Sequence, residues 1–237
     1  MTDNEHHDDF GEAILNELQP AKRFSTWIYQ TIEPFLGRKI IEIGSGIGNI
    51  SRQLPIGDVL TLSDYSQEYR DQLSQTYSQT DKVDVVEVDL TDDKCFVSLQ
   101  GKYDSAICLN VLEHIDDDEG ALARMATLLE PGGRLIILVP QYRFLMSEMD
   151  RRLGHFRRYS HRELRAKLEG AGLSVETIKN FNALGIPGWY VNNTLMRGTS
   201  LGANKVRLFD ATVPIMRPLE KILPLPGLSV IGVGVKK

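Results

Sequence analysis

The chain has 237 residues, of which 42% are hydrophobic, and it carries a formal net charge of −5. This length and composition suit one well-buried domain with room for a smaller cap. No apolar run approaches the length of a membrane span. The polar, acidic residues 1–10 do not resemble a signal region. We therefore expect a cytoplasmic protein whose two cysteines, Cys95 and Cys108, stay reduced.

Charge is unevenly distributed along the chain. Residues 1–140 hold 11 Lys and Arg against 25 Asp and Glu, whereas residues 141–237 hold 16 against 7. A basic second half favours an anionic substrate or an anionic membrane face, although solvated helix faces explain it equally well. A nucleic-acid partner is not expected, because the whole chain is acidic and has no basic and aromatic recognition motif.

The first predicted elements are a flexible N-terminal segment, residues 1–19, and an amphipathic helix within residues 20–36. The domain proper is expected to span residues 20–237. Apolar residues of the helix recur at the spacing of one helical face, and Trp27 lies on that face. Trp27 could cover a bound ligand, but packing in the core is the favoured interpretation.

A glycine-rich turn follows the first predicted strand. An apolar run containing Glu42 leads into three glycines at alternate positions, Gly44, Gly46 and Gly48. Glycine lets a backbone turn tightly and approach a ligand, because no Cβ is in the way. Residues 49–54 are expected to start a helix whose unpaired N–H groups face that ligand. A strand, a glycine turn and a helix together predict a nucleotide-type cofactor site.

Three further predicted strands end in a polar residue. Asp64 ends the second strand, about 20 residues after the first glycine, where a doubly wound sheet places a carboxylate that accepts from ribose hydroxyls. Its alternative role is to cap the following helix. Asp89 ends the third strand and Asn110 the fourth.

The order of these motifs resembles the class I S-adenosylmethionine (SAM) methyltransferases. Their first motif is E/D-x-G-x-G-x-G, and their later motifs match Asp89-Leu90, the segment from Asn110 to Ile115 and the turn at 131–133. The resemblance implies SAM as cofactor, S-adenosylhomocysteine as product, and an α/β, Rossmann-like, doubly wound sheet. That sheet has seven strands in the order 3-2-1-4-5-7-6, with the last strand antiparallel. The implied cofactor-binding residues are Glu42, Gly44, Ser45, Gly46, Gly48, Asp64, Tyr65, Asp89, Leu90, Asn110 and Val111.

The candidate catalytic pair is Glu113-His114, which follows the fourth strand. His114 suits a general base and Glu113 could orient the substrate. Some quinone-type O-methyltransferases bind a divalent metal through a similar pair. Two ligands are too few to infer a metal here, so none is expected. The alternative is a purely structural pair at the start of a helix.

Residues 150–160 resemble a D-x-x-L-G-H-x-R-R-Y signature of a bacterial subgroup of this family. His155 is a further catalytic candidate within this segment. Arg157 and Arg158 could grip a carboxylate or phosphate, since a guanidinium binds such groups through two hydrogen bonds. Tyr159 and Trp189 are the remaining candidates for substrate contact. The alternative is a salt-bridged hinge.

We expect a substrate cap from residues 141–160 and 183–226, the second inside an unusually long connection between the last two strands. The apolar end of this cap could line the substrate pocket or make a peripheral membrane contact, and packing as the underside of the cap explains it equally well. The predicted function is methylation, on oxygen, of a small or lipid-linked acceptor, and an anionic acceptor is one hypothesis. The alternatives are a non-catalytic partner protein with the same fold and an NAD-type oxidoreductase. Asn49 argues against the oxidoreductase, whose fingerprint has a small residue there.

Overall fold

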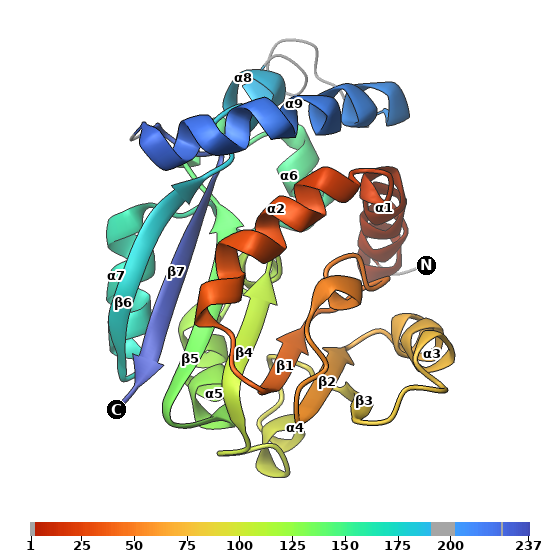
Figure 1. Cartoon of the computed structure of the whole chain (residues 1–237), viewed down its shortest axis with the longest axis vertical. Helices are drawn as coiled ribbons and strands as arrows, with labels where there is room; N and C mark the ends of the chain where they lie inside the picture. Colours follow the sequence, from red (N-terminus) through yellow and green to blue (C-terminus); the bar gives the residue numbers. More distant parts are fainter. Residues whose placement is uncertain (1–2, 191–201, 224) are drawn as a thin grey trace.

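The computed structural model describes residues 3–190, 202–223 and 225–237. Its strands form one sheet of seven in the order β3-β2-β1-β4-β5-β7-β6 (Figure 1). Strand β7 runs antiparallel to β5 and β6, while the remaining pairs are parallel. The predicted fold is therefore confirmed. The strands are β1 (Lys39–Ile43), β2 (Val59–Asp64), β3 (Val83–Glu87), β4 (Tyr103–Leu109), β5 (Leu129–Pro140), β6 (Leu173–Phe181) and β7 (Ser229–Lys236).

Helices cover both faces of the sheet. Helices α4, α5 and α7 pack on one face, and α2, α3 and α9 pack on the other. The α-helices are α1 (Asp3–Leu18), α2 (Lys22–Ile32), α3 (Gln67–Thr76), α4 (Lys94–Val97), α5 (Asp118–Leu128), α6 (Glu148–Arg152), α7 (His161–Gly170), α8 (Gly185–Trp189) and α9 (Ala203–Ile222). Short 3₁₀ helices are η1 (Glu33–Phe35), η2 (Ser51–Gln53), η3 (Leu112–His114) and η4 (Arg143–Leu145).

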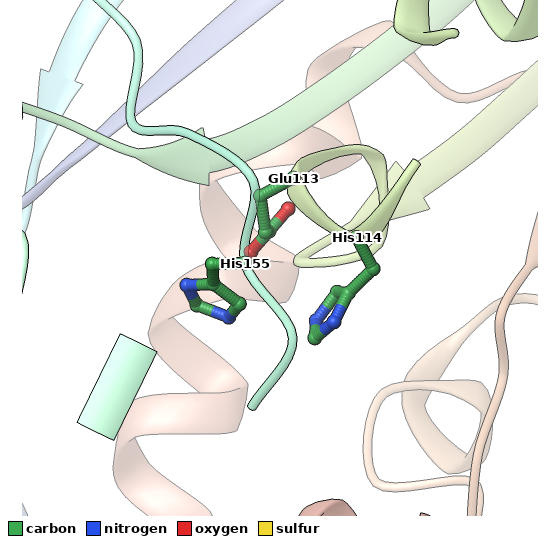
Figure 2. A group of neighbouring side chains, drawn as sticks. All are labelled: Glu113, His114 and His155. Carbon is green, nitrogen blue, oxygen red and sulfur yellow. The ribbon is translucent and has the colours of Figure 1, made fainter. Parts of the chain in front are cut away.

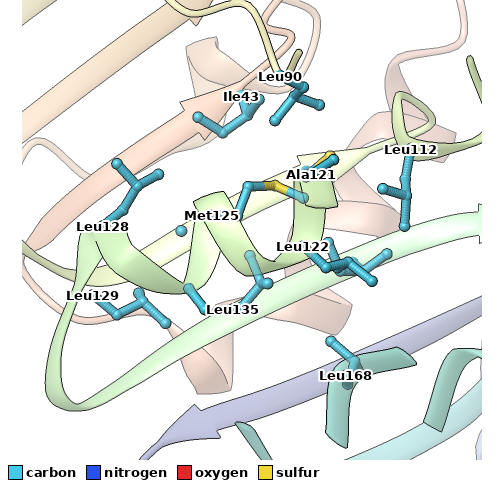
Figure 3. Close-up of a cluster of buried hydrophobic side chains, with 14 of the residues drawn as sticks. Ile43, Leu90, Leu112, Ala121, Leu122, Met125, Leu128, Leu129, Leu135 and Leu168 are labelled. Atoms are coloured by element: carbon cyan, nitrogen blue, oxygen red, sulfur yellow. The ribbon is translucent and has the colours of Figure 1, made fainter. Parts of the chain in front are cut away.

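Two hydrophobic cores lie on opposite faces of the sheet because successive strand side chains point to opposite sides. On β5, Leu135 and Ile137 join the core under α5 and α7, whereas Ile136 and Leu138 join the core under α2 and α9. Figure 3 shows the first core, with Met125 of α5 packed over the strands. Burying both faces explains why the strands have nearly continuous apolar sequences.

The connection between β6 and β7 contains α8 and α9, which lie at the end of the sheet where β1, β4 and β5 finish (Figure 1). The predicted cap at 183–226 therefore has helices, apart from residues 191–201 and 224, which lie outside the described ones. Trp27 packs against Phe181 in the core under α2, as predicted, with ring centroids 4.7 Å apart. No described helix is long and apolar enough to cross a membrane.

The α-helix expected at 49–54 does not form. Residues 51–53 form the 3₁₀ turn η2 instead, and Leu54 is already extended. The segment 1–19 contains helix α1, and its predicted flexibility stays a prediction. Leu15 of α1 accepts a hydrogen bond from Asn49 Nδ2 at 3.4 Å, so α1 lies against the glycine turn.

Candidate active site

The glycine turn joins β1 to η2 at the carboxyl end of the sheet. Gly44, Gly46 and Gly48 have φ angles of 72°, 52° and 78°, a region that side chains with a Cβ disfavour. A Cβ on Gly44 would also collide with Cγ2 of Val111, which follows β4. Gly44 is therefore required for two reasons. Its backbone is in the left-handed region, and the ends of β1 and β4 approach each other too closely there for a Cβ.

Two buried carboxyl groups, Glu42 and Asp64, flank this turn and are each 4% exposed. Asp64 Oδ2 accepts from the Gly46 amide at 2.9 Å and Oδ1 accepts from the Ser66 amide at 3.0 Å. Ser66, not Asp64, occupies the cap position of α3. Glu42 accepts from Ser51 Oγ at 2.5 Å. Burial raises the pKa of both carboxyls, that of Glu42 to about 7.

The other predicted cofactor residues follow the same edge of the sheet. Asp89 Oδ1 accepts from the amide and hydroxyl of Thr91, both at 2.7 Å, which fixes the loop after β3. Leu90 is buried in the core, whereas Tyr65 is 58% exposed. Asn110 is exposed and has a φ of 55° at the end of β4. The parallel strands bring these positions to one side of the molecule; their contacts with a cofactor stay predictions.

Glu113, His114 and His155 meet beside the end of β4, although His155 comes from the segment after α6 (Figure 2). The two imidazole rings meet edge to face, with centroids 4.6 Å apart. Glu113 is 1% exposed, and its Oε2 has no hydrogen-bond partner among the described residues. Burial raises the Glu113 pKa to about 7, against the lowering influence of His155. The amide of Phe156 donates to the Glu113 carbonyl at 2.9 Å and holds the two segments together.

Asp150, which sequence reasoning did not single out as a site residue, holds His155 in place. Its carboxylate is fully buried and its Oδ1 lies 2.9 Å from His155 Nδ1. The Ser147 amide and hydroxyl donate to its Oδ2 at 2.7 Å and 2.8 Å. Burial alone would raise the Asp150 pKa, but the His155 hydrogen bond and the charge of Arg158 lower it below the ordinary value. The only sequence signal was its place at the start of the D-x-x-L-G-H segment.

Arg158 and Tyr159 of the signature are buried, whereas Arg157 is partly exposed. Arg158 is 2% exposed, donates from Nε to Asp150 Oδ1 at 3.0 Å and lies 4.7 Å from the Trp189 ring centroid. Tyr159 is 1% exposed, and its hydroxyl donates to Asp118 Oδ2 at 2.8 Å. Arg157 pairs with Asp118 at 2.8 Å. These contacts form a network of ion pairs and hydrogen bonds, and a hinge at this segment stays an alternative. Direct substrate contact by these four signature and cap residues stays a prediction.

A family model described as a methyltransferase domain matches residues 17–178, more than half of the chain. The chain belongs to the class I SAM-dependent methyltransferases. The matched range includes the glycine turn and the group of Glu113, His114 and His155, and it ends within β6. Helix α9 lies beyond it.

Individual relatives of this methyltransferase are distant. A ubiquinone biosynthesis O-methyltransferase of Aeromonas salmonicida is 27% identical over 124 residues, which are 52% of this chain and 51% of that protein. The chain thus matches about half the length of that curated relative. A SAM-dependent methyltransferase of Mesorhizobium loti has a TM-score of 0.58 at 15% identity, covering 89% of this chain and 98% of that one. The methyltransferase CalH, solved in complex with S-adenosylhomocysteine, has a TM-score of 0.58 at 16% identity, covering 93% and 58%.

SAM is the cofactor of this family, and the residues present fit it. Two buried carboxyls beside a glycine turn, whose Gly46 amide is held by Asp64, suit a ligand with ribose hydroxyls and a positive sulfonium. One ligand atom from each of Glu113, His114 and His155 lies within 4.8 Å of the others, so this group has the donors for a cation. The expectation that no metal is needed stays a prediction.

Proposed function

We propose that this methyltransferase transfers a methyl group from SAM to a hydroxyl oxygen of a small or lipid-like acceptor, with an anionic acceptor favoured. The observation that carries the proposal is the Asp150-His155 pair. It stands beside Glu113 and His114, close to the end of β4. A hydroxyl needs a base to remove its proton as it attacks, and a carboxylate-held imidazole suits this task.

Bound SAM supplies an electrophilic methyl group on a sulfonium. We assign Asp64 to the ribose hydroxyls, Asp89 to the adenine amino group and Leu90 to the adenine ring. Glu42, Ser45 and the three glycines would form the floor of this site, with Tyr65, Asn110 and Val111 at its rim. Support comes from the family motif and from the position of these residues along one edge of the sheet.

His155 is the residue to which we assign the general base. Its Nδ1 faces the Asp150 carboxylate at 2.9 Å, so the ring proton lies on Nδ1 and Nε2 is left as the acceptor. When Nε2 takes the proton of the acceptor hydroxyl, the Asp150 carboxylate stabilises the imidazolium that forms. Glu113 adds to this above about pH 7, where its carboxyl is ionised. His114 packs against the ring edge and orients the acceptor in this proposal.

The acceptor site would lie between the end of β4 and the cap. The Arg157 side chain is 24% exposed and could therefore reach an acceptor. Trp189 is half-buried, with its ring against the Arg158 guanidinium. The excess of basic residues after 140 supports an anionic acceptor. The names of the distant relatives, which are ubiquinone biosynthesis O-methyltransferases, support oxygen as the methylated atom.

A cytoplasmic location and a peripheral membrane contact are part of this proposal. The two cysteines are both unpaired thiols, which suits a reducing compartment. A lipid-linked acceptor would require the protein to work at a membrane surface. No nucleic-acid partner is proposed.

Calorimetric titration tests the cofactor site first. We expect S-adenosylhomocysteine to bind the wild type and the His155→Gln variant alike, and to bind Asp64→Ala far more weakly, because that variant loses the ribose acceptor and a partner of the Gly46 amide. NAD should not bind. Binding of NAD alone would favour the oxidoreductase alternative.

Methyl transfer is then measured as S-adenosylhomocysteine release with catechol, 3,4-dihydroxybenzoate and aniline as probes. Turnover of the two phenols but not of aniline, with the carboxylated phenol preferred, is the expected result. Tight cofactor binding without turnover of any phenol or of a membrane lipid extract would support the non-catalytic partner protein. Preference for aniline would refute the assignment to oxygen.

A further inference from the structure

Helix α9 packs on the body of the protein through one face only. Val206 and Val213 are buried on that face, next to α2. The two acidic residues of the helix also point inward. Asp210 Oδ1 accepts from the Phe24 amide at 2.9 Å, and Glu220 accepts from the amides of Asn182 and Ala183. These contacts fix the helix on the end of the sheet where the strands β1, β4 and β5 finish (Figure 1).

The opposite face of α9 is apolar and points to solvent. Leu208, Ile215 and Ile222 are 70%, 66% and 78% exposed, and Leu219 is also exposed. The first three follow one another at intervals of seven residues, or about two helical turns, so they form one stripe along the helix. Scattered apolar residues on a surface need no explanation, but an aligned stripe indicates an interaction surface.

The exposed charged side chains that α9 carries next to this stripe are positive. They are Arg207 and Lys221, which share one side of the helix. Both acids of the helix are used internally, so its outer face carries cations without anions. The start of α2, which packs against α9, adds exposed Lys22 and Arg23. This combination of an apolar stripe with flanking cations is typical of helices that lie in the interface of an anionic bilayer.

We infer that the outer face of α9 binds the surface of a membrane that contains anionic phospholipids. The apolar stripe would enter the headgroup region while the flanking cations contact lipid phosphates. A second copy of the chain fits less well, because symmetric pairing of two such faces brings like charges together. This inference deepens the proposed function only by naming the surface from which a lipid-linked acceptor would be reached.

The test is co-sedimentation of the full chain with vesicles, either of phosphatidylcholine alone or of equal parts phosphatidylcholine and phosphatidylglycerol. We expect binding to the anionic vesicles only, weakened by added salt. The variant Ile215→Ser/Ile222→Ser should lower the partition coefficient by about tenfold per side chain. The variant Arg207→Gln/Lys221→Gln should lower it by about fivefold per charge.

A matched control changes the same residue types on α4, at the opposite end of the molecule (Figure 1). Lys94→Gln/Val97→Ser removes one exposed cation and one apolar side chain that is 69% exposed, and vesicle binding should not change. Binding of S-adenosylhomocysteine to every variant shows that each one folds. It also separates the two proposals, because vesicle binding does not depend on methyl transfer.

Two outcomes would overturn the inference. The wild type could fail to bind anionic vesicles, or the α9 variants could bind them as well as the wild type. If the wild type fails to bind, gel filtration could also show a dimer that Ile215→Ser/Ile222→Ser abolishes. That result would assign the face to a second copy of the chain.

Discussion

Replacing Glu113 by Gln should change how the stability of the protein depends on pH. The Glu113 carboxyl is buried, its Oε2 has no partner among the described residues, and its pKa is raised from 4.5 to about 7. Between these pH values the folded protein keeps a proton that the unfolded chain has already released. The free energy of unfolding therefore falls as the pH rises through this window, and the loss is complete above about pH 7.

The size of the effect follows from the two pKa values. One pH unit corresponds to about 1.4 kcal/mol, so moving the pKa from 4.5 to about 7 costs about 3 kcal/mol once the folded carboxyl must ionise. Glu113→Gln keeps the shape of the side chain but has no proton to release. The free energy of unfolding should therefore fall more steeply with pH in the wild type than in the variant. Between about pH 5 and about pH 8 the wild type should lose roughly 2.5 kcal/mol more of this free energy.

Urea denaturation followed by circular dichroism at a series of pH values measures this difference. Glu42 has a similarly raised pKa, so both proteins keep a common slope from that residue and only their difference reports on Glu113. Glu68→Gln, at an exposed position, is the control for removing one carboxyl from the chain. Parallel pH profiles for wild type and Glu113→Gln would show that the Glu113 carboxyl is ionised in the folded protein, and the reasoning would be refuted.

Three further predictions concern the site. Gly44→Ala should destabilise the protein more than Gly132→Ala. Both glycines have positive φ, where an alanine costs about 1–2 kcal/mol of stability, but only the Cβ at position 44 would meet a neighbour, Val111. Equal losses of stability in thermal unfolding would contradict the close approach of Gly44 and Val111. Asp150→Asn should lower kcat by about 10²–10⁴ and shift its pH profile, with S-adenosylhomocysteine affinity kept; an unchanged pH profile would leave Asp150 a structural role only. Removal of metal with EDTA should not change the methylation rate, and loss of activity restored by a divalent cation would assign the Glu113 group to metal binding.

Helix α6, which carries Asp150, and helix α9 lie at the same end of the sheet (Figure 1). The family model covers the first and ends before the second. The proposed general base therefore lies in the part of the chain that the family model covers, whereas the proposed membrane contact lies in a part that the model does not include.

Local sequence determined most of the sheet. Apolar runs such as Leu135–Val139 form strands because both faces of the sheet are buried, and glycines at 44, 46 and 48 form a turn that needs positive φ. These signals are local, so periodicity and residue type reveal them. The strand order came from the resemblance, because pairing between distant segments leaves no mark in either segment alone.

The tertiary structure alone decided the surroundings of the site. His155 lies some 40 residues after His114 in the chain, yet the two rings are in contact, because the Phe156 amide bonds to Glu113 and Asp150 fixes the imidazole. Burial of Arg158 depends on the same packing. The short 3₁₀ turn after the glycines, where a helix was expected, forms where Glu42 accepts from Ser51 in the interior. Sequence patterns determine which secondary structure each segment prefers. Burial and side-chain pairing depend on contacts between distant segments, which only the tertiary structure establishes.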